Sequence, residues 1–102
     1  MKIKTIDVNA KEWFDKVNGN SYFAGIITIN FGMKSQKSIV MEFQYGYGDQ
    51  YSYQALKSLQ EEGIIKDVQE NESYWMYYER KGIIARHSLR ENCLKRELIH
   101  IA

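Results

Sequence analysis

The chain has 102 residues, 44% of them hydrophobic, and a formal net charge of +1 at pH 7. This length and this apolar content predict a single folded domain spanning residues 1–102 and argue against a chain that stays disordered. The near-neutral charge argues against a strongly polyanionic or polycationic partner as the default.

Cys93 is the single cysteine of the chain, so an internal disulfide is excluded and a reducing compartment is indicated. No apolar run approaches the length of about 18 residues that a membrane-spanning helix requires. The opening residues, MKIKTIDVNA, lack the apolar centre of a signal peptide. We therefore expect a cytoplasmic protein without a membrane partner.

The first half of the chain is rich in strand signals. Residues 2–14 are strand-like, but Trp13 and Phe14 are adjacent, which predicts a bulge or a short helical turn at 10–16. The sequence NGN at residues 18–20 then predicts a turn between two apolar segments.

Two further strands are predicted at 22–32 and 38–47, joined by a polar loop. In the first of them, one face carries the large apolar residues Phe23, Ile27, Ile29 and Phe31. In the second, the residues alternate, and the shared apolar face carries Ile39, Met41, Phe43, Tyr45 and Tyr47. Short polar turns between three consecutive strands indicate an antiparallel meander.

Two helices are expected after the strands, at 50–62 and 72–81. The first helix has an apolar stripe formed by Ala55, Leu56 and Leu59. Asp49 and Asn71 stand where the two N-caps belong. Both helices end in a glycine followed by isoleucine, which predicts two Schellman stops with left-handed glycines: Gly63-Ile64 and Gly82-Ile83.

The chain closes with a predicted strand at 83–90 and a short element at 94–101. On this strand the two faces carry different residues: Arg86, Ser88 and Arg90 on one, His87 and Leu89 on the other. The pattern of 94–101 suits a helical turn as well as a short strand, packed on the sheet. The order β-β-β-α-α-β predicts an α+β fold, a small antiparallel sheet with two helices on one face. The other face is then solvated or used for contact.

Two short motifs resemble those of uncharacterised small proteins from tailed bacteriophages. The first is N-S-Y at residues 20–22, and the second is Y-G-Y-G-D-x-Y at residues 45–51, just before a helix. The similarity extends as a pattern over residues 1–85. It implies a phage origin, with the host cell as the place of action, and it implies no mechanism and no functional residues.

The stretch 45–53 is the first candidate site, and its expected partner-binding residues are Tyr45, Tyr47, Asp49, Tyr51 and Tyr53. Gly46 and Gly48 remove side chains from the strand, so a ring, a base or another backbone can approach closely. Tyrosine is also enriched in contact hot spots. The alternative is structural: Asp49 caps the helix, and the tyrosines pack in the core and at its rim.

Arg86, His87 and Arg90 on the last strand form the second candidate, in which Arg86 and Arg90 make a row that suits contact with an anion such as phosphate or carboxylate. Residues 80–102 hold six Lys/Arg and two Glu, a net charge of +4, which hints at an acidic partner. The alternative is an exposed basic edge that deters aggregation.

Catalysis has little support in the sequence, because His87, His100 and Cys93 lie outside any acid–base, nucleophile or zinc motif. We expect no enzyme activity, no metal site and no cofactor. Two functions remain. One is an accessory protein that binds and inhibits or modulates a host protein, such as a component of CRISPR or another defence system. The other is a module that binds nucleic acid or a small nucleotide through tyrosine stacking and C-terminal Arg/Lys. The oligomeric state stays open, a homodimer included.

Overall fold

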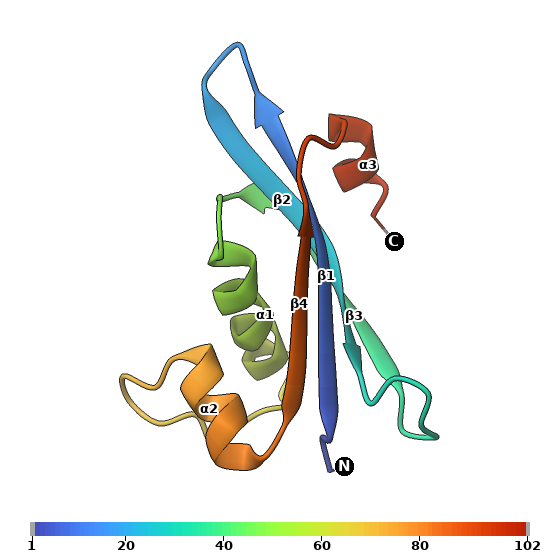
Figure 1. Cartoon of the computed structure of the whole chain (residues 1–102), viewed down its shortest axis with the longest axis vertical. Helices are drawn as coiled ribbons and strands as arrows, with labels where there is room; N and C mark the ends of the chain where they lie inside the picture. Colours follow the sequence, from blue (N-terminus) through green and yellow to red (C-terminus); the bar gives the residue numbers. More distant parts are fainter. Residues whose placement is uncertain (1, 102) are drawn as a thin grey trace.

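The computed structural model describes residues 2–101 and shows a four-stranded sheet with three helices (Figure 1). The strands are β1 (Thr5–Asp15), β2 (Asn20–Ile29), β3 (Lys37–Tyr45) and β4 (Ile84–Arg90). The helices are α1 (Gln50–Glu61), α2 (Tyr74–Lys81) and α3 (Lys95–Ile99). The predicted α+β class and the order β-β-β-α-α-β are confirmed, and the ambiguous last element is a short helix.

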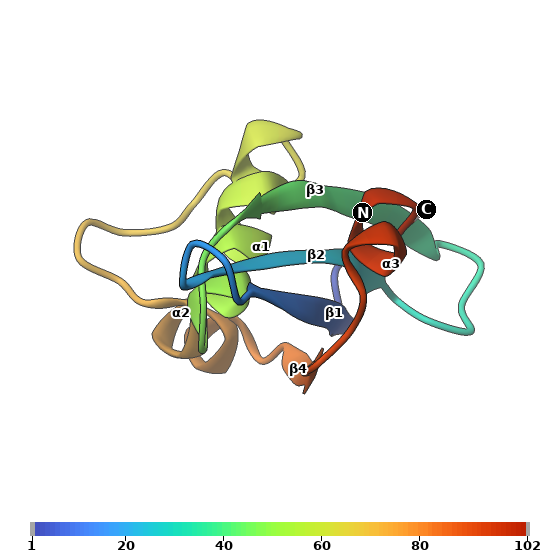
Figure 2. The same cartoon turned by 90° about the horizontal axis from the view of Figure 1, so that it is seen from above.

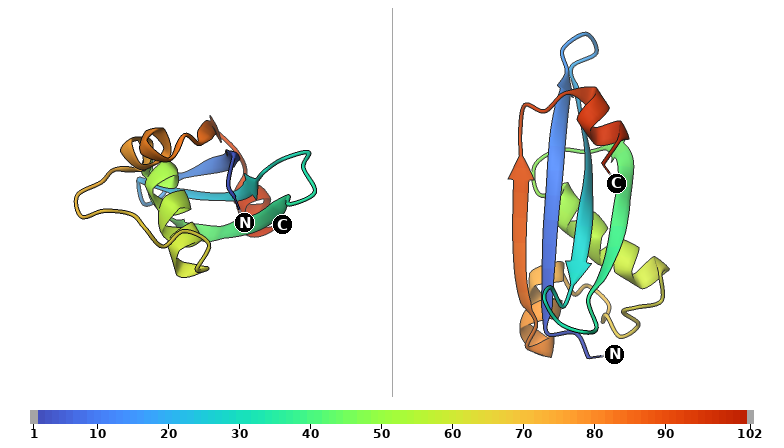
Figure 3. Two further views of the ribbon diagram at one scale, coloured as in Figure 1. Left: turned by 90° about the horizontal axis from the view of Figure 1, so that it is seen from below. Right: turned by 90° about the vertical axis from the view of Figure 1, so that its right-hand side faces the viewer.

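The sheet has the strand order β3-β2-β1-β4, which the right-hand view of Figure 3 shows face-on. The pairs β1–β2 and β2–β3 are antiparallel, as the meander predicts. β4, however, pairs with β1 in parallel, so the sheet is mixed and the expectation of a wholly antiparallel sheet is wrong. The reason is that α1 and α2 return the chain to the end of the sheet where β1 begins, beside Lys4.

Helices lie on both faces of the sheet, as Figures 1 and 2 show. α1 and α2 cover one face, as expected, and bury the main core, whose largest fully buried members include Ile6, Ile27, Ile29, Met41 and Leu59. α3 covers part of the other face. Beneath it lies a smaller core formed by Ala24, Cys93 and Leu98, flanked by Trp13, Tyr22, Phe43 and Ile101.

β1 is a continuous strand, so the bulge or helical turn expected at 10–16 is wrong. Its pairing with β2 runs unbroken as far as Asp15. This pairing keeps the backbone extended, and the two adjacent aromatic side chains point to opposite faces. Trp13 packs under α3, whereas Phe14 is exposed.

The irregularity lies instead in β3, where one extra residue forms a β-bulge. Phe23 pairs with Gln44 but Gly25 pairs with Met41, so three steps along β3 match two steps along β2. The extra residue reverses the alternation of faces. Met41 faces the main core, while Phe43 packs in the smaller core on the opposite face. The predicted shared face of the strand therefore ends at Met41.

β2 ends three residues earlier than the strand pattern predicts, because Asn30 turns the chain. Asn30 has a φ of 52° and is fully buried. Its Oδ1 accepts the backbone N–H groups of Lys4 and Thr5 at 2.7 and 3.2 Å, and its Nδ2 donates to the carbonyl of Lys2 at 2.9 Å. This clamp ties the start of the chain to the β2–β3 loop. Phe31 lies beyond it and is exposed, so its assignment to the core face is wrong.

The predicted N-cap position is confirmed for Asp49, although the expected capping bond is missing, and the prediction for Asn71 is wrong. Asp49 occupies the N-cap position of α1 but makes no side-chain capping bond; Oε1 of Gln50 instead accepts the N–H of Tyr47 at 2.7 Å. α2 begins later than predicted, with Ser73 at its N-cap, and Asn71 has a φ of 62° in the preceding loop.

Both C-terminal stops are confirmed. Gly63 and Gly82 have φ values of 72° and 68°. The following isoleucines donate their N–H groups back over five residues, to the carbonyls of Leu59 and Tyr78, at 3.0 and 2.9 Å. These are the bonds of a Schellman motif.

Leu59 is fully buried against the sheet, so Leu59→Ala is expected to lower the free energy of unfolding by about 2–5 kcal/mol. Denaturant unfolding measures this loss. Gln60→Ala, at the exposed neighbouring position, is the matched control and changes stability little. A loss below about 0.5 kcal/mol at Leu59 contradicts the packing of α1 described above.

Gly82→Ala is expected to cost about 1 kcal/mol or more, because alanine resists the left-handed conformation. A Cβ at this position would meet no atom within 4 Å, so the cost comes from the backbone alone. Gly82→Asn is expected to cost less, since asparagine tolerates positive φ better. Equal unfolding free energies for the glycine and alanine proteins would contradict the left-handed stop.

Candidate functional site

The five residues predicted as one contact surface point in different directions. Tyr45 and Tyr47 are 61% and 63% exposed, and Asp49 is exposed as well. Tyr51 is buried in the main core, and Tyr53 is 45% exposed. The bulge turns Tyr45 toward the face that α3 covers, where its ring stands edge-on to Tyr22. The stretch 45–53 is therefore a junction between two faces of the molecule and does not form one surface.

Gly46 and Gly48 serve the geometry of this junction. A Cβ on Gly46 would lie 2.5 Å from Cε1 of Phe23, too close for any side chain. Gly48 has a φ of 61°, a conformation that favours glycine. The two glycines allow the chain to cross the end of the sheet tightly, and Gly46 leaves no open space for a ligand at its own position.

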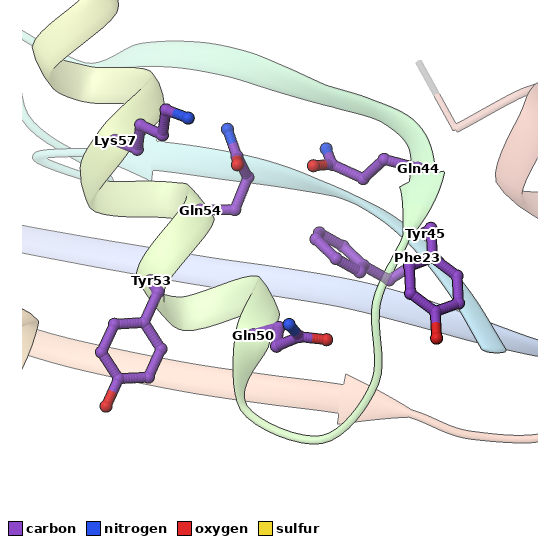
Figure 4. A pocket seen from close by; sticks show the side chains of 7 residues that line it. All are labelled: Phe23, Gln44, Tyr45, Gln50, Tyr53, Gln54 and Lys57. Carbon is purple, nitrogen blue, oxygen red and sulfur yellow. The ribbon is translucent and has the colours of Figure 1, made fainter.

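A hollow of about 390 Å³ lies between α1 and the end of β3, and Figure 4 shows its lining: Phe23, Gln44, Tyr45, Gln50, Tyr53, Gln54 and Lys57. Three glutamine amides and the Lys57 amine supply most of its polar groups. Tyr53 points away from Gln44 and Phe23. These groups form hydrogen bonds well, but they do not provide the paired acid and base that proton transfer needs.

The largest gathering of aromatic side chains lies on the other side of α1, where α1 and α2 meet β4. We call it the aromatic cluster, and it consists of Tyr51, Tyr53, Tyr74, Trp75, Tyr78 and His87. The His87 ring lies 5.2 Å from the ring centre of Tyr74, 6.1 Å from that of Tyr78 and 6.2 Å from that of Tyr51. The imidazole of His87 on β4 is therefore packed against rings from both α1 and α2.

His87 and Tyr78 carry buried polar atoms that are not hydrogen-bonded within residues 2–101. These atoms are Nε2 of His87 and the hydroxyl of Tyr78. Burial lowers the pKa of His87, and burial raises the pKa of Tyr78. Both side chains are therefore neutral near pH 7, and the imidazole packs among phenol rings as an uncharged group.

The outer part of the aromatic cluster, which we call the aromatic rim, consists of Tyr53, Tyr74 and Trp75. Tyr53 and Trp75 are exposed, whereas Tyr74 is partly buried. The ring of Tyr74 stands nearly perpendicular to both others, at 4.9 Å from Tyr53 and 5.2 Å from Trp75. Trp75 is 52% exposed and Met76, next to it, is exposed as well. Edge-to-face contacts of this kind are favourable and fix the orientation of the rings.

Ion pairs hold α2, which carries most of the rim, against the loop before it. Nε of Arg80 lies 2.7 Å from Glu72, and Nζ of Lys81 lies 2.6 Å from Asp67. The Tyr77 hydroxyl also donates to Asp67, at 2.6 Å. The hydrogen bonds from Lys81 and Tyr77 lower the pKa of Asp67 to about 2. The carboxylate therefore stays ionised and keeps α2 in place over a wide pH range.

The arginine row is partly neutralised. Nε and Nη2 of Arg86 donate to the two carboxylate oxygens of Asp7 at 2.6 and 3.0 Å. The guanidinium group is therefore already engaged in a bidentate ion pair within the chain. This pairing disfavours the predicted role of Arg86 in contact with an external anion. Arg90 is exposed on the same face of β4 and stays a candidate.

Sequence reasoning places Tyr51 and Tyr53 at one candidate site and His87 at another, so it misses that the fold brings them together. It also misses three residues that lie beside them: Tyr74, Trp75 and Tyr78. One signal was available. The run Y-W-M-Y-Y at 74–78 carries aromatic residues at four of five consecutive helical positions. Such a run covers more than one face of a helix, so at least one ring has to be exposed.

Within residues 2–101, no group of three or more His, Cys, Asp or Glu side chains is arranged to hold a metal ion. No helix in the same range has the length and apolar content needed to cross a membrane. Comparison of the chain with protein-family models, curated proteins and solved structures finds no match.

The buried imidazole predicts a stability that depends on pH. Because the pKa of His87 is lowered by folding, the unfolded chain binds this proton more strongly. The contribution of His87 to the free energy of unfolding is then fully present above the ordinary histidine pKa of about 6.5. This contribution is lost as the pH falls below that value. Unfolding measured at about pH 7.5 and about pH 5 should show this loss. His87→Gln should reduce it, and an equal loss in both proteins would contradict the assignment.

Proposed function

We propose that this protein acts by binding a partner protein without catalysis, and that the aromatic rim lies at the centre of the contact. The observation that carries the proposal is the exposure of Tyr53 and Trp75 side by side on two helices. Tryptophan and tyrosine dominate the binding energy of protein interfaces. A folded domain that leaves such rings in water as a group has a surface suited to association.

The rim is also held in place before any partner arrives. Ion pairs to Asp67 and Glu72 fix α2 from outside, and Tyr77 and Tyr78 anchor it in the main core. The edge-to-face contacts through Tyr74 restrict the exposed rings further. Binding then requires little additional ordering of side chains, which raises the affinity that a small surface can reach.

The resemblance to tailed-bacteriophage proteins supplies the biological setting of the proposal. In that setting the partner is a host protein, and binding inhibits or modulates it in the cytoplasm of the infected cell. A component of a defence system, CRISPR included, is the partner class that we favour. The exposed residues Tyr45, Tyr47 and Asp49 lie on the loop side of α1 and remain candidates for additional contacts.

Binding of nucleic acid or a small nucleotide is the competing function. Stacked rings do occur on the α3 face, where Tyr22 lies 5.1 Å from Phe43. Two cations near them are engaged, however: Lys95 lies over Trp13, and Lys11 lies 3.9 Å from Glu97. A stacking surface for bases needs free rings and free cations together. We therefore favour the protein partner.

Trp75→Ala and Tyr53→Ala are expected to weaken capture of the partner at least tenfold, which is a loss of about 1.4 kcal/mol or more, because exposed Trp and Tyr dominate the binding energy of interfaces. Capture is measured by pull-down from host lysate with quantitative mass spectrometry, and purified partner then gives the affinity. Thermal unfolding of each variant checks that the fold is retained.

Phe31→Ala is the matched control, because this aromatic side chain is also exposed but lies in the loop after β2, outside the aromatic rim. It should capture the partner as well as the wild type does. Retained capture by both rim variants would refute the role of the rim. Capture that is lost after nuclease treatment, or nucleotide released from the purified protein, would favour the competing function.

A further inference from the structure

We propose that the free edge of β4 receives an extended segment of the partner as a fifth strand, and that this segment alternates apolar and acidic residues. The inference rests on the proposed function and adds the mode of recognition. β4 is an outer strand of the sheet, and in the right-hand view of Figure 3 no strand lies beyond it. The outer side of an edge strand presents unpaired N–H and C=O groups that can pair with another chain.

The two edges of the sheet differ in how well they can accept a strand. β3, at the opposite edge, contains the bulge at Glu42 and Phe43 across from Ala24, which interrupts regular pairing. β4 pairs with β1 over seven consecutive residues without a register shift. A strand added to β4 can therefore keep a regular register along its whole length.

One face of β4 leads into a hollow next to the aromatic rim. Ala85, His87 and Leu89 point to the helix side and are partly buried. A hollow of about 260 Å³ lies between β4 and α2, lined by Tyr74, Trp75, Tyr78, Glu79, Ile83, Ala85 and His87. Its lining comes from α2, β4 and the residue before β4, so the hollow opens beside the free edge. An apolar side chain of an added strand can enter it, against the same rings that form the rim.

The opposite face of β4 is basic. Arg86 and Arg90 alternate there with Ser88, and Lys11 of β1 lies beside Arg90 in the register. Asp7 neutralises Arg86, and Glu97 lies 3.9 Å from Lys11. Among these three cations of the face, Arg90 therefore has no ion pair within residues 2–101. Opposite charges across neighbouring strands stabilise their pairing. An acidic residue beside Arg90 therefore complements this face.

Successive residues of a strand point to opposite faces, so one added segment meets both surfaces. Its apolar residues face the rings of the aromatic cluster, and its acidic residues face the arginines. A second copy of the chain fits less well. Pairing β4 with β4 would gather four arginines on one face of the joined sheet, and only the two Arg86 side chains among them are paired with Asp7.

The test uses the full chain and a capped peptide of seven residues, the length of β4, in which valine and glutamate alternate. Titration by calorimetry measures binding, and amide hydrogen exchange by NMR locates it. We expect saturable binding that slows exchange at the outward N–H groups of β4. A second peptide of the same sequence carries N-methyl groups on alternate amides, and it should bind at least tenfold more weakly because strand pairing is blocked.

Two charge-reversal variants test whether the positive charge of Arg90 contributes to peptide binding. Arg90→Glu should weaken binding of the first peptide at least tenfold, whereas the matched reversal Arg96→Glu, on α3, should change it less than twofold. Absence of binding, equal binding of the two peptides, or protection away from β4 would each overturn the proposal, as would self-association that protects β4. If Trp75→Ala loses partner capture while no peptide protects β4, the proposed function stands and strand addition fails.

Discussion

The extra residue in β3 is the constraint on which the arrangement of the aromatic side chains depends. Without the bulge opposite Ala24, strict alternation would place Phe43 and Tyr45 on the face of Met41, beneath α1. With it, Phe43 packs under α3 and supports the smaller core around Leu98. The bulge therefore gives the sheet two apolar faces of unequal size and lets a five-residue helix close the second one.

The same change of face divides the tyrosines between two environments. Tyr45 lies with the aromatic side chains under α3, whereas Tyr51 and Tyr53 begin a helix that packs toward α2 and β4. The motif around Gly46 and Gly48 is thus a structural junction. The rings that combine exposure with fixed orientation come from two helices that are separated by a long loop in the chain.

Charge is distributed so that it reinforces this arrangement. The ion pairs of α2 lie at its C-terminal end, where Arg80 and Lys81 also interact favourably with the helix dipole. The pairing of Arg86 with Asp7 ties β4 to β1 on the open face. Surface pairs of this kind contribute little stability individually, but they restrict how the two elements that border the aromatic cluster can move.

The elements with local signals could be predicted from the residues alone: three strands joined by polar turns, the buried stripe of α1, and the glycine stops at Gly63 and Gly82. The parallel pairing of β4, the reversal of faces after Met41 and the contact of His87 with three tyrosines follow from the three-dimensional fold. These features depend on contacts between residues far apart in the chain. Periodicity reports which residues of one element share a face, and it cannot report which other element covers that face.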